Sequence, residues 1–302
     1  MLAILQQGTS GHRKDWYHFF RTISKNQVKL VYASDFINLL RIREKLLITF
    51  FDEKKYFFLF LIVSRSLLFR KTVSIYFSWP NKKKGKVLSL KFIEYYFFLA
   101  FSYFLNIKLI SPFFRKSNIF LTDLNFFDIH NANEYISQIP EYDFAFFGGC
   151  SKEKNIGGFL EVVSKLDSSC RILIQTGSNL SKQFRESIKE MKGLTLINEY
   201  LPKKSLLKLM SKSEYIWAYY DESYNQSSGI VGHAIQLNRK VFVRKGSLLG
   251  RLEFSNILPI ENIDDIPTFI NKDRTPHSDI GPLINSNNIY EATDRWRSVL
   301  LG

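Results

Sequence analysis

Apolar and polar residues follow one another along the chain in a pattern that predicts strands and helices in turn. In the second half, short apolar runs typical of buried parallel strands alternate with segments whose apolar positions recur at helical spacing. The predicted strands are 142–147, 171–175, 194–197, 215–220 and 240–244, and the predicted helices are 156–166, with Asn155 as its cap, 182–191, 205–210 and 230–237. Strands and helices that alternate with short turns predict a doubly wound, parallel α/β sheet.

The first half has the same α/β character with less regularity. Strands are predicted at 2–6, 28–33, 46–51, 72–77 and 108–111, and a helix at 16–24 with Asp15 as its N-cap. The pattern changes near Pro140. We therefore expect an N-terminal domain of residues 1–140, a second domain of residues 141–285, and a C-terminal helix within 286–302 that packs back toward the first domain.

The longest apolar block, residues 87–105, raises the question of a membrane span. A spanning helix needs about 20 mostly apolar residues, and this block nearly reaches that length. However, Lys91 and Glu94 lie in its first half, and a predicted strand follows it directly. The block therefore favours a core helix, or a helix that lies against a membrane interface, over a span.

The net charge of +14 is concentrated in the first half. Residues 1–140 hold 21 Lys and Arg against 9 Asp and Glu, whereas the remainder holds 21 against 19, and 20 of the 28 Phe lie in residues 1–140. A basic, aromatic half suits an anionic membrane surface, where charge attraction and apolar insertion add. Nucleic acid is the competing partner, but its recognition interleaves basic and exposed aromatic residues, and here the aromatics come in blocks. Compositional drift toward Lys, Asn, Phe and Ile is the third explanation.

Cysteine usage and the N-terminal sequence suggest a compartment. Cys150 and Cys170 lie far apart and outside any CxxC, which argues against a disulfide framework or a zinc site and favours reducing conditions. The N-terminus has neither the basic nor the apolar region of a signal peptide. With the basic first half, this predicts a cytoplasmic protein that is peripheral at the inner face of the cell membrane and does not bind nucleic acid.

The stretch 219–250 carries the most informative local pattern. A buried strand is followed by a small-residue turn, QSSG at 226–229, that opens a helix. Backbone amides at the start of a helix are unsatisfied and carry partial positive charge, so they suit a phosphate or a sugar hydroxyl. The alternative is an ordinary strand–helix–strand crossover in which the glycine only makes the turn.

A set of short motifs occurs in order between residues 142 and 252. They are FFGG at 146–149, KNI at 154–156, ILIQTG at 172–177, YLP at 200–202, SSGI at 227–230, HA at 233–234, VFV at 241–243 and Gly246. The set resembles the C-terminal domain of GT-B glycosyltransferases, and most of all the group 1 branch that builds bacterial surface polysaccharides. The resemblance implies two Rossmann-like α/β domains that face each other across a cleft, with a nucleotide sugar bound by the second.

Carried over position by position, the resemblance implies a donor site in the loops after the strands. The diphosphate would lie against the first glycine loop, with its charge balanced by Lys154 or by Lys152 in its stead. The turn at 177–178 would lie near the nucleotide, Tyr200 and Leu201 would border the base, and the Ser-Gly turn would meet the diphosphate or the sugar. The implied donor-binding residues are Gly148, Gly149, Ser151, Lys154, Gly177, Ser178, Tyr200, Leu201, Ser227, Ser228, Gly229 and His233.

The chain departs from the family at charged positions. Retaining members carry two glutamates eight positions apart, and here these positions hold Asn225 and His233. The arginine that follows the first loop's glycine is replaced by Gly149 or Cys150, depending on the alignment.

An inverting transfer would instead need a base with a pKa near the working pH. His12 follows the glycine turn after the first predicted strand, at the edge where such sheets bind ligands, and Asp15 lies nearby. These two are the candidate catalytic residues, with His130 as a further histidine of the first half. The alternatives are a surface histidine and, for Asp15, a plain helix cap.

Two functions remain from the sequence. The first is a metal-independent, hexosyltransferase-type enzyme that moves a sugar from a UDP- or GDP-linked donor to a lipid-linked or growing glycan acceptor, with no cofactor. The second is a catalytically inactive GT-B-like partner or binding subunit, which the missing glutamates permit. Nucleic-acid binding by the basic half is a third possibility. The sequence lacks Asp-x-Asp, GxxxxGK[ST], GxSxG and a GxGxxG after the first strand, which argues against metal-dependent GT-A transfer, P-loop, α/β-hydrolase and dinucleotide chemistry.

Overall fold

The chain folds into two compact units. The computed structural model describes residues 139–272 apart from 178, 179, 181, 190, 223, 225–227 and 253, six strands of the first half, and the single residues 21, 64, 96, 100, 135, 294 and 298. One unit comprises Met1–Asn125 with Ser286–Gly302, and the other comprises Phe126–Asn285. The helix expected at 16–24, the apolar block 87–105 and the C-terminal helix lie almost wholly outside the described residues, so their predicted structures and roles stay predictions.

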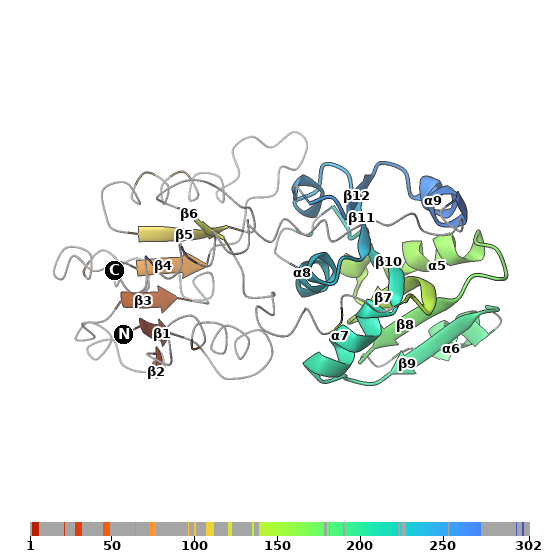
Figure 1. The fold of residues 1–302 in the computed structure, drawn as a ribbon, viewed down its shortest axis with the longest axis horizontal. Helices are drawn as coiled ribbons and strands as arrows, with labels where there is room; N and C mark the ends of the chain where they lie inside the picture. The colour runs from red at the N-terminus through yellow and green to blue at the C-terminus, as the bar shows by residue number, and fades with distance from the viewer. Residues whose placement is uncertain are drawn as a thin grey trace. The chain divides into compact units, whose positions relative to one another are not determined.

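The first unit contains a six-stranded parallel sheet (Figure 1). Its strands are β1 (Leu2–Leu5), β2 (Val28–Val31), β3 (Lys45–Ile48), β4 (Val73–Tyr76), β5 (Ile107–Ser111) and β6 (Phe120–Thr122). Their order is β2-β1-β3-β4-β5-β6, and every neighbouring pair is parallel. Five of the strands lie within the predicted ranges or extend one residue outside them. The short β6 was not predicted.

The second unit contains another six-stranded parallel sheet, in the order β12-β11-β10-β7-β8-β9. Its strands are β7 (Tyr142–Phe147), β8 (Ile172–Thr176), β9 (Leu194–Asn198), β10 (Ser213–Ala218), β11 (Lys240–Arg244) and β12 (Ile257–Ile260). The first five confirm the prediction. We did not predict β12, which contains Pro259; proline is tolerated there because β12 is an edge strand.

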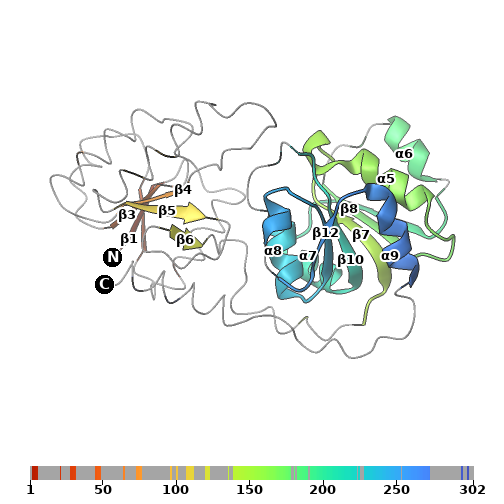
Figure 2. The ribbon, with the colours of Figure 1, turned by 90° about the horizontal axis from the view of Figure 1, so that it is seen from above.

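Helices cover both faces of this second sheet (Figure 2). They are α5 (Ile156–Ser164), α6 (Lys182–Lys189), α7 (Lys203–Ser211), α8 (Gly229–Gln236) and α9 (Ile266–Lys272), with short 3-10 turns at Lys152–Lys154, Leu249–Arg251 and Ile263–Asp265. Helices α7 and α8 pack together on one face, and α5, α6 and α9 lie on the other. The unit is therefore doubly wound, as the alternation of strands and helices predicts.

An aromatic cluster forms the core between the sheet and α5. Phe144 of β7, Phe159 of α5, Trp217 of β10 and Phe242 of β11 are fully buried. Ring centroids lie 4.7 Å apart for Phe144 and Phe159, and 6.1 Å apart for Phe144 and Trp217. Phe144 and Trp217 meet edge to face, and such a pair adds about 0.5–1.5 kcal/mol beyond the burial of area. The cluster fixes β7, β10 and α5 against one another.

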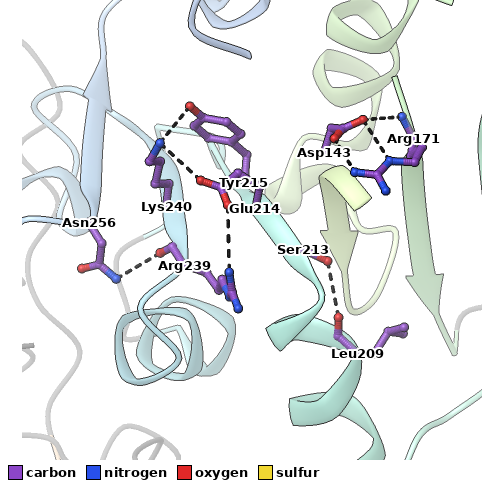
Figure 3. Close-up of polar contacts among 9 residues, drawn as sticks. All are labelled: Asp143, Arg171, Leu209, Ser213, Glu214, Tyr215, Arg239, Lys240 and Asn256. Atoms are coloured by element: carbon purple, nitrogen blue, oxygen red, sulfur yellow. Dashed lines mark hydrogen bonds and ion pairs between the residues drawn. The ribbon is translucent and has the colours of Figure 1, made fainter. Parts of the chain in front are cut away.

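Charged side chains at the amino edge of the sheet balance one another (Figure 3). The carboxylate of Glu214 lies 3.3 Å from the ammonium of Lys240 and 3.9 Å from the guanidinium of Arg239, and all three side chains are more than four-fifths buried. Burial lowers the pKa of Arg239, and Glu214 opposes that shift. The amide of Asn256 donates to the carbonyl oxygen of Arg239 at 3.0 Å. These contacts tie the start of β11 to the start of β10.

Two glycines with positive φ allow a matched test of backbone packing. Gly193 (φ +72) precedes β9, and a Cβ there would collide with the carbonyl oxygen of Cys170, whereas a Cβ at Gly246 (φ +78) would meet nothing within 4 Å. A left-handed alanine costs about 1–2 kcal/mol. We expect Gly246→Ala to lower the free energy of unfolding by about that amount, and Gly193→Ala to lower it by on the order of 3 kcal/mol or more. Urea unfolding of the two variants measures the difference, and equal losses would contradict the packing at Gly193.

Candidate functional site

The strand order places a topological switch between β7 and β10. The chain runs from β7 outward to β8 and β9, and then returns to form β10 on the opposite side of β7. The segments after β7 and β10 therefore lead to α5 and α8 on opposite faces of the sheet (Figure 2). Sheets of this type bind ligands at the carboxyl ends of the strands beside such a switch. The two segments that meet there are residues 148–155, here the lysine loop, and residues 219–228, here the β10 loop.

Asn155 ends the lysine loop and joins it to the β10 loop. Its backbone is left-handed (φ 54, ψ 49), a conformation that asparagine tolerates better than most residues. Its side-chain oxygen accepts a hydrogen bond from the amide of Gly158 at 3.3 Å and so caps α5, as the sequence predicts. Its side-chain amide also donates to the carbonyl oxygen of Tyr219 at 3.3 Å.

Two further hydrogen bonds fasten the neighbouring residues of the lysine loop. The amide of Asp221 donates to the carbonyl oxygen of Glu153 at 2.8 Å. The indole N–H of the buried Trp217 donates to the carbonyl oxygen of Lys154 at 2.9 Å. Three consecutive residues are thus bonded to β10 or the β10 loop, so the backbone that carries the Lys154 side chain is fixed.

The ammonium of Lys154 is held in a partly buried position, away from the carboxylates that the structure describes. It lies against Gly148, where a Cβ would occupy its place, and 5.9 Å from the centre of the Tyr220 ring. Gly148 also has φ +94, so both its backbone and the lysine require glycine there. Among the residues that the structure describes, no carboxylate lies within 4.0 Å of this ammonium. Burial lowers the pKa of Lys154. The position therefore favours an anionic ligand.

Cys150 lies near the lysine but does not neutralise it. Its thiol interacts with the hydroxyl of Thr176, with 3.6 Å between Sγ and Oγ1. Burial raises the pKa of Cys150, with Thr176 and Lys154 acting in the opposite direction. The side chain therefore remains a neutral thiol at physiological pH.

Tyr220 connects the lysine loop to the start of α8. Its hydroxyl lies 3.3 Å from the hydroxyl of Ser228, which caps α8 by accepting from the amide of Val231 at 3.4 Å. Burial raises the pKa of Tyr220 to about 12, so the phenol keeps its proton. Tyr220 thus has the Lys154 ammonium near its ring and the positive end of α8 near its hydroxyl.

A second part of the predicted site forms where β8 and β9 end. The side-chain amide of Gln175 donates to the carbonyl oxygen of Glu199 at 2.8 Å and holds the two strand ends together. A Cβ on Gly177 would lie 3.4 Å from Cα of Tyr200, so the two backbones are close. The Tyr200 side chain is 86% exposed, and an exposed aromatic ring offers a face on which a base can stack.

The other predicted site residues fall into two groups. Ser151 and Gly149 lie in the lysine loop, Gly229 is the first residue of α8, Leu201 is half-buried, and His233 is buried in α8. Their donor-binding roles stay predictions. Outside the described residues lie His12, Asp15, Asn225, Ser178 and Ser227.

Sequence reasoning missed several residues that shape this edge. Arg244, the last residue of β11, donates from Nε to the carbonyl oxygen of Tyr220 at 3.1 Å, and its guanidinium lies 4.3 Å from the centre of the Tyr219 ring. Its Nη1 also lies 3.8 Å from the carboxylate of the exposed Glu222. A charged residue at the end of an otherwise apolar strand was the only available signal for Arg244. Nothing in the sequence distinguishes Tyr220 or Trp217 from ordinary core aromatics.

The described residues offer neither a metal-binding cluster nor a membrane-spanning helix. They hold no group of three or more His, Cys, Asp or Glu placed to bind a metal ion. No helix within them combines the length and the apolar character needed to cross a bilayer. Metal independence and attachment to a membrane stay predictions.

Comparison with known proteins identifies the fold. No family model matches the sequence, and no curated protein sequence matches it either. Among solved structures, Anabaena HepE bound to UDP matches with a TM-score of 0.60 and 8% identity, over 99% of this chain and 97% of HepE. An α-glucosyltransferase bound to UDP and a 13-mer DNA matches with a TM-score of 0.52 and 10% identity, over 99% of this chain and 94% of that protein.

TarM, known also from an S. aureus structure, matches with a TM-score of 0.54 and 13% identity over 88% of this chain. The chain spans about half of TarM, 54% of its length. These likenesses confirm that the chain has the GT-B fold, with two Rossmann-like α/β units.

The unbalanced charge of Lys154 should destabilise the ligand-free protein. The unfolded chain binds the lysine proton more tightly than the folded chain, so stability is lowest below the folded pKa and rises as pH increases toward 10.5. We therefore expect Lys154→Met to raise the thermal midpoint at pH 7 in phosphate-free buffer, with a difference that shrinks as pH rises toward 10.5. Lys152→Met, a change at an exposed lysine of the same loop, is the control and should leave the midpoint unchanged. A lower midpoint for Lys154→Met would contradict the unbalanced charge.

Proposed function

We propose that this protein is a glycosyltransferase that moves a sugar from a nucleotide-sugar donor to an acceptor hydroxyl. The observation that carries the proposal is the partly buried ammonium of Lys154 beside Gly148, at the switch of a GT-B sheet, with no described carboxylate within 4.0 Å. An anion at this point restores the charge balance that the protein leaves open. HepE, which has the same fold, is known in complex with UDP-glucose, and another protein of this fold is an α-glucosyltransferase bound to UDP. A fold alone does not fix a reaction, so the proposal depends on the site.

The donor is proposed to lie along the carboxyl edge of the second sheet. Its diphosphate contacts the lysine loop at Gly148, Gly149, Ser151 and Lys154, together with the α8 start. Its base lies toward the exposed ring of Tyr200, because that ring stands beside the close approach of β8 and β9. Lys154 lies 5.9 Å from the centre of the Tyr220 ring, and the Ser228 hydroxyl at the α8 start lies 3.3 Å from the Tyr220 hydroxyl. Two positive groups near one tyrosine support the binding of two linked phosphates.

The chemistry follows from the charge that develops on the leaving group. As the bond between the anomeric carbon and the phosphate oxygen breaks, negative charge grows on the departing nucleoside diphosphate. Lys154 is already in place and largely out of water, so it stabilises this charge without moving. The acceptor oxygen forms the new bond to the anomeric carbon, and its proton passes to a base, for which His12 and then Asp15 are proposed. Positioning and charge stabilisation suffice for this reaction, without a metal ion or another cofactor.

The acceptor is proposed to be a lipid-linked or growing glycan in polysaccharide biosynthesis. The first half of the chain holds the excess of Lys, Arg and Phe, and this composition suits an anionic, partly apolar surface at the inner face of the cell membrane. Because an α-glucosyltransferase of this fold is known with DNA, retention on DNA that weakens steeply with salt would favour a nucleic-acid partner instead.

A second candidate is a partner subunit that binds the donor without turnover. The observation that favours it is that Asn225 and His233 stand where retaining relatives carry glutamates. Binding without any sugar transfer, tested over a broad donor panel with membrane extract as the acceptor source, would support this candidate. Transfer of radiolabelled sugar into the extract would support the enzyme.

Substitution of Lys154 should weaken donor binding. We expect Lys154→Met to raise the Kd for UDP at least about tenfold, which corresponds to about 1.4 kcal/mol, because a buried charge-assisted contact is lost. Lys208→Met, a change at an exposed lysine of α7, is the control and should bind UDP as the wild type does. Isothermal titration calorimetry measures both, first with UDP and then with GDP. An unchanged Kd for Lys154→Met would refute the placement of the diphosphate.

A further inference from the structure

Asn155 makes more contacts than a helix cap requires. Capping α5 uses only its side-chain oxygen, which accepts from the amide of Gly158. The side-chain amide instead reaches the carbonyl oxygen of Tyr219, 64 positions further along the chain, on the other side of the switch. The residue also holds a left-handed backbone directly after Lys154.

We infer that Asn155 is a positioning residue, which holds Lys154 in its place beside Gly148 so that the donor phosphate meets a fixed cation. The inference rests on the proposed function, because it concerns the cation that is proposed to bind the donor phosphate at that same site.

Two opposing effects act on the lysine loop: the hydration of the ammonium and the hydrogen bonds that hold the backbone. An ammonium that has no described carboxylate within 4.0 Å gains free energy by turning toward water, since burial penalises its charged form. The loop can follow that movement only if its backbone is released from β10 and the β10 loop. Three hydrogen bonds oppose the release: the carbonyl oxygens of residues 153 and 154 accept from Asp221 and Trp217, and the side-chain amide of Asn155 donates to Tyr219. Among these bonds, the Asn155 bond is made by the loop's own side chain. Removal of this side chain should therefore free the lysine while leaving the core intact.

The test uses glycine, which keeps the left-handed backbone and removes both side-chain bonds. Glycine is also nearly as good an N-cap as asparagine, so Asn155→Gly should unfold at nearly the same urea concentration as the wild type. We expect its Kd for UDP to rise about tenfold. The matched control is Asn238→Gly, which alters the other left-handed asparagine of the described residues (φ 53), at the turn after α8. It should bind UDP as the wild type does.

A double-mutant cycle with Lys154→Met separates positioning from a general structural effect. If Asn155 acts through Lys154, Asn155→Gly changes UDP affinity only while the lysine is present, and the double variant binds as Lys154→Met does. Additive losses in the double variant would overturn the inference, as would wild-type affinity in Asn155→Gly.

A second measurement needs no nucleotide and so keeps the inference separate from the proposed function. The pKa of Lys154 can be followed by NMR on lysine labelled with ¹³C at Cε. In Asn155→Gly it should rise toward the ordinary lysine value, because the ammonium gains access to water, whereas in Asn238→Gly it should stay lowered. An unchanged pKa in Asn155→Gly overturns the positioning role. A rise in the pKa together with no nucleotide binding by the wild type overturns the proposed function alone.

Discussion

The carboxyl edge of the second unit is organised around one electrostatic constraint, the partly buried ammonium of Lys154, which has no carboxylate within 4.0 Å among the residues that the structure describes. The local structure follows from this constraint. Gly148 must lack a side chain to leave room for the ammonium, and the Tyr220 ring supplies a weakly attractive face. The hydrogen bonds from Trp217 and Asn155 keep the backbone from carrying the charge outward. A partly buried charge that no described carboxylate balances lowers stability, and such groups are typical of binding sites.

Much of the second unit could be predicted because its physics is local. Buried parallel strands appear as apolar runs, and β7 and β11 match their predicted ranges residue for residue. Asn155 was recognised as a cap from its residue type and its place before an apolar helix. By contrast, β12 was missed because Pro259 weakens a strand pattern, and β6 because three residues carry too little pattern. The bond from Trp217 to the carbonyl of Lys154 joins residues 63 positions apart, and no local rule foresees such a contact.

The GT-B fold was predicted from the order of weak motifs rather than from any single one. Each motif alone describes a turn or a strand end, but a parallel sheet brings the ends of all its strands to one edge, so order in the sequence becomes proximity in space. That is why Gly148, Lys154 and Ser228 come to lie around Tyr220 although 80 positions separate the first from the last. The roles of His12 and Asp15 depend on the first unit, where the sequence pattern is less regular and local rules say less.

The amino edge of the second sheet and the lysine loop at its carboxyl edge differ in how their charges are balanced. At the amino edge Glu214 is matched by Arg239 and Lys240, and Asp143 by Arg171, so these side chains satisfy one another (Figure 3). At the carboxyl edge Arg244 lies 3.8 Å from the carboxylate of Glu222, whereas no carboxylate of the described residues lies within 4.0 Å of the Lys154 ammonium. The amino ends of the strands thus carry stabilising ion pairs, and the carboxyl ends carry the proposed donor site. Residues at the carboxyl ends can change while the contacts at the amino ends keep the domain folded. This separation helps to explain how proteins of only 8–13% identity retain one architecture.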